Sequence, residues 1–351
     1  MEFNRREYLK HRALARRYRK LIHPEYVYLD LLRDILDEGE DYPTFVSEKM
    51  KQRYYRDRDV PYSRGLYGAV MEFDLRESFP LFTTKKTFFK GIITELLWLL
   101  RGSGNIKFLV DNNVRIWDEW GWQKYLEKAE TLTPDSPPLG LEEYRQALRL
   151  DPEFARVYGD LGSAYPVNWR HFKGEGNREA DQIAWLIRSL KQDKTRRHYV
   201  VSAWHPCYVY EMARPGEAMA LPPCHVIFHF KVTRDNYLNC SLFQRSADMF
   251  LGVPFNVASY AALTYMIAHV VPGLKPGKFV HFLADYHIYS NHFEVVQAQL
   301  KRTPLAFAQL SLNPEIDDID CFELKDFTLR NYQAHPPLAG EVALVGGMYG
   351  E

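Results

Sequence analysis

The residue best suited to covalent chemistry is Cys224, which lies in the segment LPPCHVIFHF. Two prolines stiffen the approach to it and alternating residues follow, so we expect the sulfur at the end of a strand, exposed but rigidly held. A lone thiol is more often a buried structural group, and a nucleophilic thiol needs positive charge nearby to favour the thiolate. Arg245 is the candidate source of that charge.

Arg245 belongs to the segment QRSADMFLGVPFN, residues 244–256, which is dense in short polar side chains and then turns into a helix. Arg245 and Ser246 could bind an anion, and Asp248 and Asn256 could bind the polar edge of a ring. An ordinary loop with a helix cap and a salt bridge is the alternative. So many donors in thirteen residues favour a binding site.

Glu95 is the one carboxylate in the apolar segment Phe88–Leu100. A buried carboxylate needs partners or a raised pKa, so Glu95 is either a general acid/base or a caged structural group. Arg196 and Arg197 directly precede an expected strand. Adjacent arginines usually form a solvated turn, but paired guanidinium groups also match the planar oxygens of a phosphate.

His287 and Tyr289 lie two residues apart and share one side if the backbone is extended. We expect no metal site here, because no third ligand follows at ligand spacing. Trp117 and Trp120 are typical of a core by residue type, yet either could also stack on a flat ring.

The cysteines indicate a reducing, cytoplasmic setting, since they include no CxxC pair and fit neither a disulfide framework nor a zinc site. No apolar signal segment opens the chain. The longest apolar run, Val257–Pro272, is too short and too polar to span a bilayer. The four cysteines are Cys207, Cys224, Cys240 and Cys321.

Hydrophobic periodicity predicts the elements that must position these residues. Helices are expected at Tyr26–Glu38, Phe88–Leu100, 180–194 and Val257–Val271. Strands are expected at Leu66–Leu75, His198–Trp204, His225–Val232 and Tyr237–Gln244, with a strand end at His281–Ala284, a turn at Asp235-Asn236 and a loop at 51–64. Strands outside a simple β-α alternation favour a mixed sheet covered by helices.

Composition and charge exclude further classes of protein. The 351 residues include 45 basic and 45 acidic side chains, which excludes a strongly basic nucleic-acid coat and an acidic disordered protein. We expect one catalytic domain at 24–344, carrying a small helical insertion at 122–160. A basic helical extension at 1–23 precedes it and an extension at 345–351 follows it.

Seven segments, in family order, resemble the thymidylate synthase family. They are FPLFTTKK (79–86), TELLWLLRG (94–102), NNVRIWDEW (112–120), RRHYVVSAW (196–204), LPPCH (221–225), FQRSADMFLGVPFNVASY (243–260) and HIYSNH (287–292). The similarity runs from about Tyr26 to Leu344. It implies a three-layer α/β fold whose large mixed, mostly antiparallel sheet is covered by helices. It also implies a homodimer that packs sheet to sheet and shares Arg196 and Arg197 across the interface.

The resemblance implies a reaction between dUMP and 5,10-methylenetetrahydrofolate. The folate supplies the one-carbon unit and the hydride, so no metal is required. The Cys224 thiolate would add to carbon 6 of uracil and make carbon 5 nucleophilic. Asn256 would pair with the uracil edge, where relatives that use cytosine would have an aspartate.

The resemblance also assigns the remaining roles. The catalytic residues would be Cys224, Glu95, Tyr165, Asn256 and Asp248. Those that bind dUMP would be Arg58, Arg196, Arg197, Gln244, Arg245, Ser246, Asn256, His287 and Tyr289. Those that bind folate would be Lys85, Trp117, Trp120, Leu221, Asp248, Leu251, Gly252 and Phe255.

Among the departures from the family, one bears on the role of Arg58 and another leaves the product open. The loop after Arg58 reads DRDVPYS, where the family has a Gly/Thr-rich stretch, and VGGMYGE follows Leu344, where family chains end in a carboxylate that closes the site. Poor closure would favour a hydroxymethylase, whereas Trp117 and Leu221, which would shield the methylene intermediate, favour the synthase. A third alternative is a catalytically inactive family member that binds nucleotide or its own RNA. Only the basic segment 5–20 supports it, so nucleic acid is not an expected partner.

Overall fold

The computed structural model describes residues 22–46, 48–132, 137–209, 212–214 and 218–343. Most of the expected basic extension at 1–23, and all of the extension at 345–351, lie outside the described residues. Within the described ranges, no helix has both the length and the apolar run that crossing a membrane requires.

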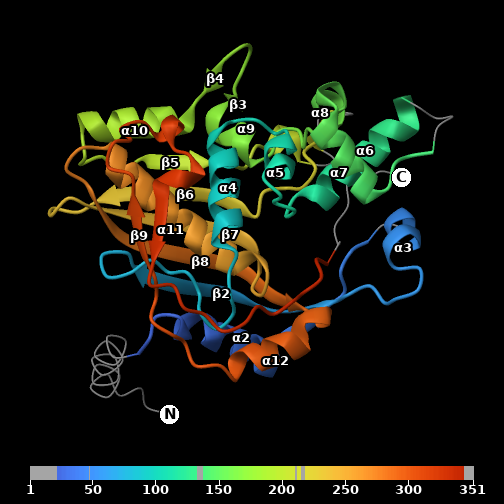
Figure 1. Cartoon of the computed structure of the whole chain (residues 1–351), viewed down its shortest axis with the longest axis horizontal. Coiled ribbons are helices and arrows are strands. Elements are labelled where there is room, and N and C mark those ends of the chain that lie inside the picture. Colours follow the sequence, from blue (N-terminus) through green and yellow to red (C-terminus); the bar gives the residue numbers. More distant parts are fainter. Residues whose placement is uncertain (1–21, 47, 133–136, 210–211, 215–217, 344–351) are drawn as a thin grey trace, which may run out of the picture.

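A six-stranded sheet forms the centre of the molecule (Figure 1). All neighbouring strands are antiparallel except β7 and β8, which are parallel. The expected mixed, mostly antiparallel sheet is therefore confirmed. In spatial order its strands are β1 (Glu40–Tyr42), β2 (Ser63–Asp74), β8 (Lys275–Tyr289), β7 (Tyr237–Asp248), β6 (His225–Val232) and β5 (Tyr199–Ser202).

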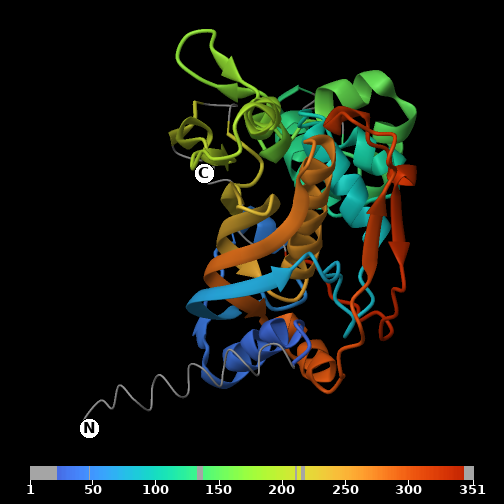
Figure 2. The same cartoon turned by 90° about the vertical axis from the view of Figure 1, so that its left-hand side faces the viewer.

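Helix α11 (Gly252–Val270) forms a second layer against β7 and β8. Helix α4 (Phe89–Leu100) and strand β9 (Gln309–Leu312), which pairs with β10 (Phe327–Arg330), lie on the far side of α11 and form the third layer (Figure 2). Apolar residues surround α11 almost completely, as is typical of a helix packed on both sides.

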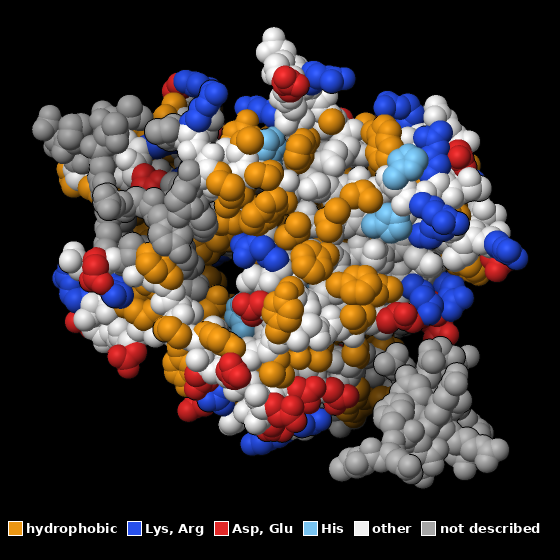
Figure 3. Space-filling model, turned by 180° about the vertical axis from the view of Figure 1, so that it is seen from behind, with side chains coloured by type: hydrophobic (Ala, Val, Ile, Leu, Met, Phe, Trp, Pro, Cys, Tyr) orange, Lys and Arg blue, Asp and Glu red, His pale blue; other side chains and the backbone are white. Residues whose placement is uncertain are grey.

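The two faces of the sheet differ because successive side chains of a strand point to opposite sides. Leu242 and Leu283 face α11 and are buried. Val70, Phe282 and Phe243 pair across β2, β8 and β7 on the other face, and each is more than 40% exposed. Figure 3 shows apolar side chains gathered on the side of the molecule opposite that seen in Figure 1.

The remaining helices surround this framework. Helix α2 packs against β2 and α12, and α10 packs against α9 and β5. Their bounds are α2 (Tyr26–Glu38), α3 (Glu48–Tyr54), α5 (Lys107–Asp111), α6 (Asp118–Leu132), α7 (Leu141–Leu150), α8 (Pro152–Tyr158), α9 (Tyr165–Arg170), α10 (Gln182–Gln192) and α12 (Phe293–Leu300); a short ribbon joins β3 (Phe172–Lys173) to β4 (Glu179–Ala180).

The segment 122–160 is helical, as expected. Helices α6, α7 and α8 pack through four aromatic rings whose neighbouring centroids lie 4.7–6.1 Å apart. The almost fully buried side chains of Arg145 and Asp118 form an ion pair between α7 and α6. That this unit is an insertion stays a prediction. The four rings belong to Tyr125, Tyr144, Phe154 and Tyr158.

Several expected boundaries were wrong. Part of the expected loop at 51–64 belongs to α3 and β2, because Tyr54 and Tyr55 pack in a small cluster with Val46. Strand β7 continues past Gln244, since pairing with β8 overrides the polar local sequence. For the same reason His281–Ala284 is not a strand end but lies inside β8. Helix α11 begins at Gly252, five residues before the expected start.

Candidate active site

Cys224 lies immediately before β6, at the strand end where it was expected. The N–H of Arg245 on β7 donates to the Cys224 carbonyl at 2.9 Å. Beyond this bond the β6–β7 register shifts between His225 and Ile227. Such irregularities are typical at the ends of strands, where they redirect side chains.

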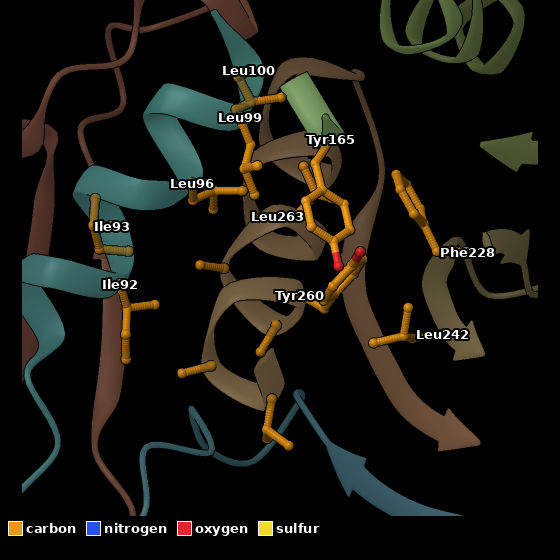
Figure 4. Close-up of a cluster of buried hydrophobic side chains, with 14 of the residues drawn as sticks. Ile92, Ile93, Leu96, Leu99, Leu100, Tyr165, Phe228, Leu242, Tyr260 and Leu263 are labelled. Carbon is orange, nitrogen blue, oxygen red and sulfur yellow. The ribbon is translucent and has the colours of Figure 1, made fainter. Parts of the chain in front are cut away.

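Tyr165, the first residue of α9, holds the backbone on either side of the thiol. Its buried hydroxyl accepts the N–H of Cys224 at 2.5 Å and the N–H of His225 at 3.2 Å. Burial, and then the nearby Cys224, raise the pKa of Tyr165 well above its usual value. In Figure 4, Tyr165 points toward Tyr260 of α11, next to the leucines of α4. The phenol hydroxyl therefore links α9 to the backbone at the start of β6.

Arg245 supports the turn before Cys224 from the other side. Its Nε donates to the Pro223 carbonyl at 3.0 Å and its Nη2 to the Pro222 carbonyl at 2.9 Å, while the guanidinium lies 5.6 Å from the centroid of the Trp204 ring. Burial raises the pKa of the Cys224 thiol, and the charge of Arg245 opposes that rise. The expected cation is thus near the sulfur, although burial outweighs it.

Glu95 lies on α4 and receives a hydrogen bond from the indole nitrogen of Trp117, with 2.8 Å between Nε1 and Oε1. Burial raises the pKa of Glu95 to about 7, against the lowering effect of this hydrogen bond. The Trp117 ring meets the Tyr165 ring edge to face at 6.0 Å. Glu95 can therefore both donate and accept a proton near neutral pH, one aromatic ring away from the residue that holds Cys224.

His225 and Asn256 were not linked by the sequence reasoning, which overlooked His225. Burial lowers the pKa of His225 to about 4, and a hydrogen bond to Asn256 at the start of α11 opposes that effect. His225 is thus neutral near pH 7, and its Nδ1 has no hydrogen-bond partner among the described residues. Its position directly after Cys224 was the only signal in the sequence.

The carboxyl ends of the parallel strands β7 and β8 meet beside these groups. Ser246 pairs with Asp285, and Asp248 with His287. The Asp248 carboxylate accepts the N–H groups of Phe250 and Leu251 at 2.9 and 3.0 Å and so fixes the turn into α11. Polar residues meet at this edge because parallel neighbours end on the same side of a sheet.

His287 and Tyr289 share one face of β8, as expected, with ring centroids 5.1 Å apart. The Nδ1 of His287 lies 2.8 Å from the Asp285 carboxylate, which orients the ring. Burial, and then the charges of Asp248 and Cys224, raise the pKa of Tyr289 well above its usual value. Tyr289 therefore lies within electrostatic reach of both the thiol and the end of β7.

The thymidylate synthase family model matches residues 26–344. The chain belongs to the thymidylate synthase family. Members of this family transfer a one-carbon unit from methylenetetrahydrofolate, their co-substrate, to dUMP. The residues gathered around Cys224 therefore lie in a folate-dependent one-carbon transferase.

Other residues assigned by the family resemblance have different surroundings. Gln244 donates to the Ser246 carbonyl at 2.9 Å, and its amide oxygen lies 2.8 Å from Nε2 of the buried His281, which sequence reasoning also missed. Lys85 is buried with its ammonium 3.5 Å from the centroid of the Phe250 ring. The folate candidates Trp120, Leu221, Leu251, Gly252 and Phe255 are all half-buried.

The structure does not place the remaining arginines beside Cys224. Arg196 contacts Asp193 at 3.3 Å, and the Arg197 carbonyl lies 3.1 Å from the ring of His229, both at the β5 edge of the sheet. Arg58 lies on the loop after α3 and pairs with Glu341 of the C-terminal segment. No cluster of three or more His, Cys, Asp and Glu side chains in the described part of the chain has a metal-site arrangement.

Proposed function

We propose that the chain is a thymidylate synthase, which converts dUMP and 5,10-methylenetetrahydrofolate into dTMP and dihydrofolate through a covalent adduct between Cys224 and carbon 6 of uracil. The observation that carries this proposal is the placement of Cys224. Tyr165 holds its backbone, Arg245 brings positive charge to its sulfur, and family membership supplies the class of reaction.

Addition of the thiolate makes a bond from sulfur to carbon 6 and moves the ring electrons toward oxygen 4 as an enolate. That charge needs donors aimed at it beforehand. The Asn256 amide offers one donor and one acceptor, which complement oxygen 4 and the ring N–H. Its contact with neutral His225 supports this orientation, because the histidine restricts how the amide turns.

Carbon 5 of the enolate then takes the one-carbon unit and loses its proton. Glu95, with a pKa of about 7, is our candidate for relaying protons at the pyrimidine oxygen, and Tyr165 for the region of the carbon-5 proton. Loss of the carbon-5 proton breaks the bond between the one-carbon unit and the folate nitrogen, which leaves an exocyclic methylene group on a ring still bonded to Cys224. A hydride from the resulting tetrahydrofolate reduces that group to methyl, the bond between sulfur and carbon 6 breaks to release the thiolate, and the folate departs as dihydrofolate.

The other residues bind and orient the substrates in this proposal. Arg245 and Ser246 hold the phosphate together with Arg58, while His287 and Tyr289 hold the ribose and Gln244 also contacts dUMP. Folate would contact Asp248 at the end of β7 and the residues at the start of α11, with Lys85 at its glutamate. The remaining folate contacts would be Trp117, Trp120, Leu221, Leu251, Gly252 and Phe255.

We further propose that two copies pair through the open face of the sheet in the cytoplasm. Val70, Phe282 and Phe243 leave apolar surface exposed on that face, and such patches are typical of interfaces. Arg196 and Arg197 lie away from their own Cys224, which supports their donation to the partner's site. All four cysteines are free, in keeping with a reducing compartment.

Hydroxymethylation of dUMP is the second candidate, because the chain continues past the family's usual end. Product analysis by mass spectrometry separates the two candidates. The full chain would be mixed with methylenetetrahydrofolate and dUMP, with dCMP as a parallel reaction. We expect dTMP and dihydrofolate from dUMP, whereas 5-hydroxymethyl-dUMP with tetrahydrofolate would establish the second candidate.

A further inference from the structure

An ion pair joins the loop after α3 to the C-terminal segment. Nη1 of Arg58 lies 2.6 Å from Oε2 of Glu341, although the two residues are 283 positions apart in sequence. Arg58 also donates from Nε to the Tyr54 carbonyl at 3.0 Å, and its guanidinium lies 5.2 Å from the centroid of the Tyr55 ring. Three contacts therefore fix the direction in which this guanidinium points.

Residues 340–343, which we call the tail segment, contact the rest of the protein through hydrogen bonds and close packing. The Glu341 carbonyl lies 2.7 Å from Nε2 of His292 and accepts a hydrogen bond of 3.2 Å from the Asn291 amide. At Gly340 a methyl group would lie only 2.7 Å from the Phe250 ring, so the chain lies closely against the start of α11. Two residues after Glu341, Ala343 is buried.

The ion pair is connected to the nucleophile through two tyrosines. Tyr55, which lies under the Arg58 guanidinium, is close enough to Tyr289 to affect its pKa, and so is Cys224. On the tail side, the N–H of Phe250 donates a hydrogen bond to the Asp248 carboxylate at the end of β7. Arg58 therefore contacts Tyr55, and the tail segment contacts Phe250, each of which neighbours a residue of the candidate active site.

We propose that Glu341 is a positioning residue, whose carboxylate directs Arg58 toward the phosphate of the nucleotide and so couples phosphate binding to docking of the tail. This inference rests on the proposed function, in which Arg58 binds phosphate. A guanidinium has five N–H groups, and Nη2 of Arg58 has no partner among the described residues. Arg58 can thus bind Glu341 through Nη1 and the phosphate through Nη2.

Coupling of this kind is reciprocal, because a tail that orients Arg58 must itself be held more firmly once phosphate binds. We expect the coupling between phosphate binding and tail docking to be weak. Side chains of Arg58 and Glu341 are 50% and 77% exposed, and exposed ion pairs are weak and are screened by salt. We therefore expect Glu341→Gln to weaken dUMP binding about two- to fivefold at low salt.

The test measures binding of dUMP and of deoxyuridine, which lacks the phosphate, to the full chain by calorimetry. Glu341→Gln should weaken dUMP binding and leave deoxyuridine binding unchanged, and the difference should fade in high salt. The matched control is Glu323→Gln, which removes a comparably exposed carboxylate from its 2.7 Å pair with Lys325 and should change neither.

A second measurement uses Arg58→Ala, alone and combined with Glu341→Gln. Because Glu341 acts through Arg58, the double variant should bind dUMP no more weakly than Arg58→Ala. Equal weakening of dUMP and deoxyuridine, or unchanged dUMP binding in Glu341→Gln, would overturn this inference alone. Absence of dUMP binding by the unaltered chain would overturn the proposed function together with it.

Discussion

Burial has the largest effect on the pKa of the Cys224 thiol. Its thiol pKa is raised even though Arg245 lies close enough to oppose the rise. In the proposed reaction the attacking thiolate must therefore form in a site that disfavours charge, and the arginine reduces that penalty. Sequence reasoning selected both residues as candidates, because a cysteine after two prolines and an arginine in a polar segment can be recognised from the sequence alone. It missed His225, whose burial and contact with Asn256 depend on folding.

Glu95 gives a prediction at this scale that combines rate and stability. Glu95→Gln keeps an acceptor for the Trp117 indole but cannot ionise, so we expect kcat to fall about 10²- to 10⁴-fold, as for the loss of a general acid/base. The folded pKa of about 7 exceeds the ordinary 4.5, so the folded state keeps a proton that the unfolded chain releases between those values. Glu95 therefore lowers the free energy of unfolding as the pH rises from about 4.5 to about 7.

Glu95→Gln should consequently gain stability relative to the unaltered protein between pH 5 and pH 8. Urea unfolding of both proteins at the two pH values measures this difference. An unfolding free-energy gap that is the same at both pH values would contradict the raised pKa, whatever the effect on rate.

At the scale of elements, most helices and strands were predictable from hydrophobic periodicity, and α2 was predicted with its observed bounds, Tyr26–Glu38. The length of β8 and its parallel pairing with β7 were not. They depend on a neighbouring strand that lies far away along the chain and on α11 covering one face. Local polarity near Gln244 indicated a loop, but pairing with β8 extends β7 to Asp248.

Tyr165 gives a prediction about how elements are joined. Tyr165→Phe removes the acceptor for two backbone N–H groups and loosens α9 from the start of β6. We expect a loss of about 1–3 kcal/mol in unfolding free energy and a marked fall in kcat, because the Cys224 backbone loses its support.

The matched control is Tyr125→Phe. The Tyr125 hydroxyl accepts the N–H of Leu139 at 2.9 Å within the segment 122–160. This variant should lose stability but keep its turnover, as followed by urea unfolding and steady-state rates. An equal loss of turnover in both variants would show that Tyr165 matters only for folding.

For the whole molecule, the open face of the sheet predicts assembly. Phe243→Asp places a charge in the apolar patch, so we expect the proposed dimer to separate into monomers in analytical ultracentrifugation and turnover to fall. Leu150→Asp changes an exposed leucine at the end of α7 and should leave both assembly and turnover unchanged. A Phe243→Asp protein that stays dimeric would argue against this face.

The proposed sharing of Arg196 and Arg197 between two copies allows a sharper version of this test. Cys224→Ser and the double variant Arg196→Ala, Arg197→Ala should each be nearly inactive alone. When the two proteins are mixed and allowed to exchange subunits, some mixed dimers carry one site with an intact thiol and intact arginines. Turnover should then return in part; if it does not, each copy relies on its own arginines.

The pairing of β7 with β8 has a consequence for biosynthesis. Cys224 and Arg245 leave the ribosome well before His287, and the two sets of residues become neighbours only after α11 has crossed over and the long strand has paired. Contacts between distant parts of a chain form late in folding. A chain made only as far as Arg245 therefore holds the proposed nucleophile without His287 beside it, so the proposed site is completed late, during the last part of translation.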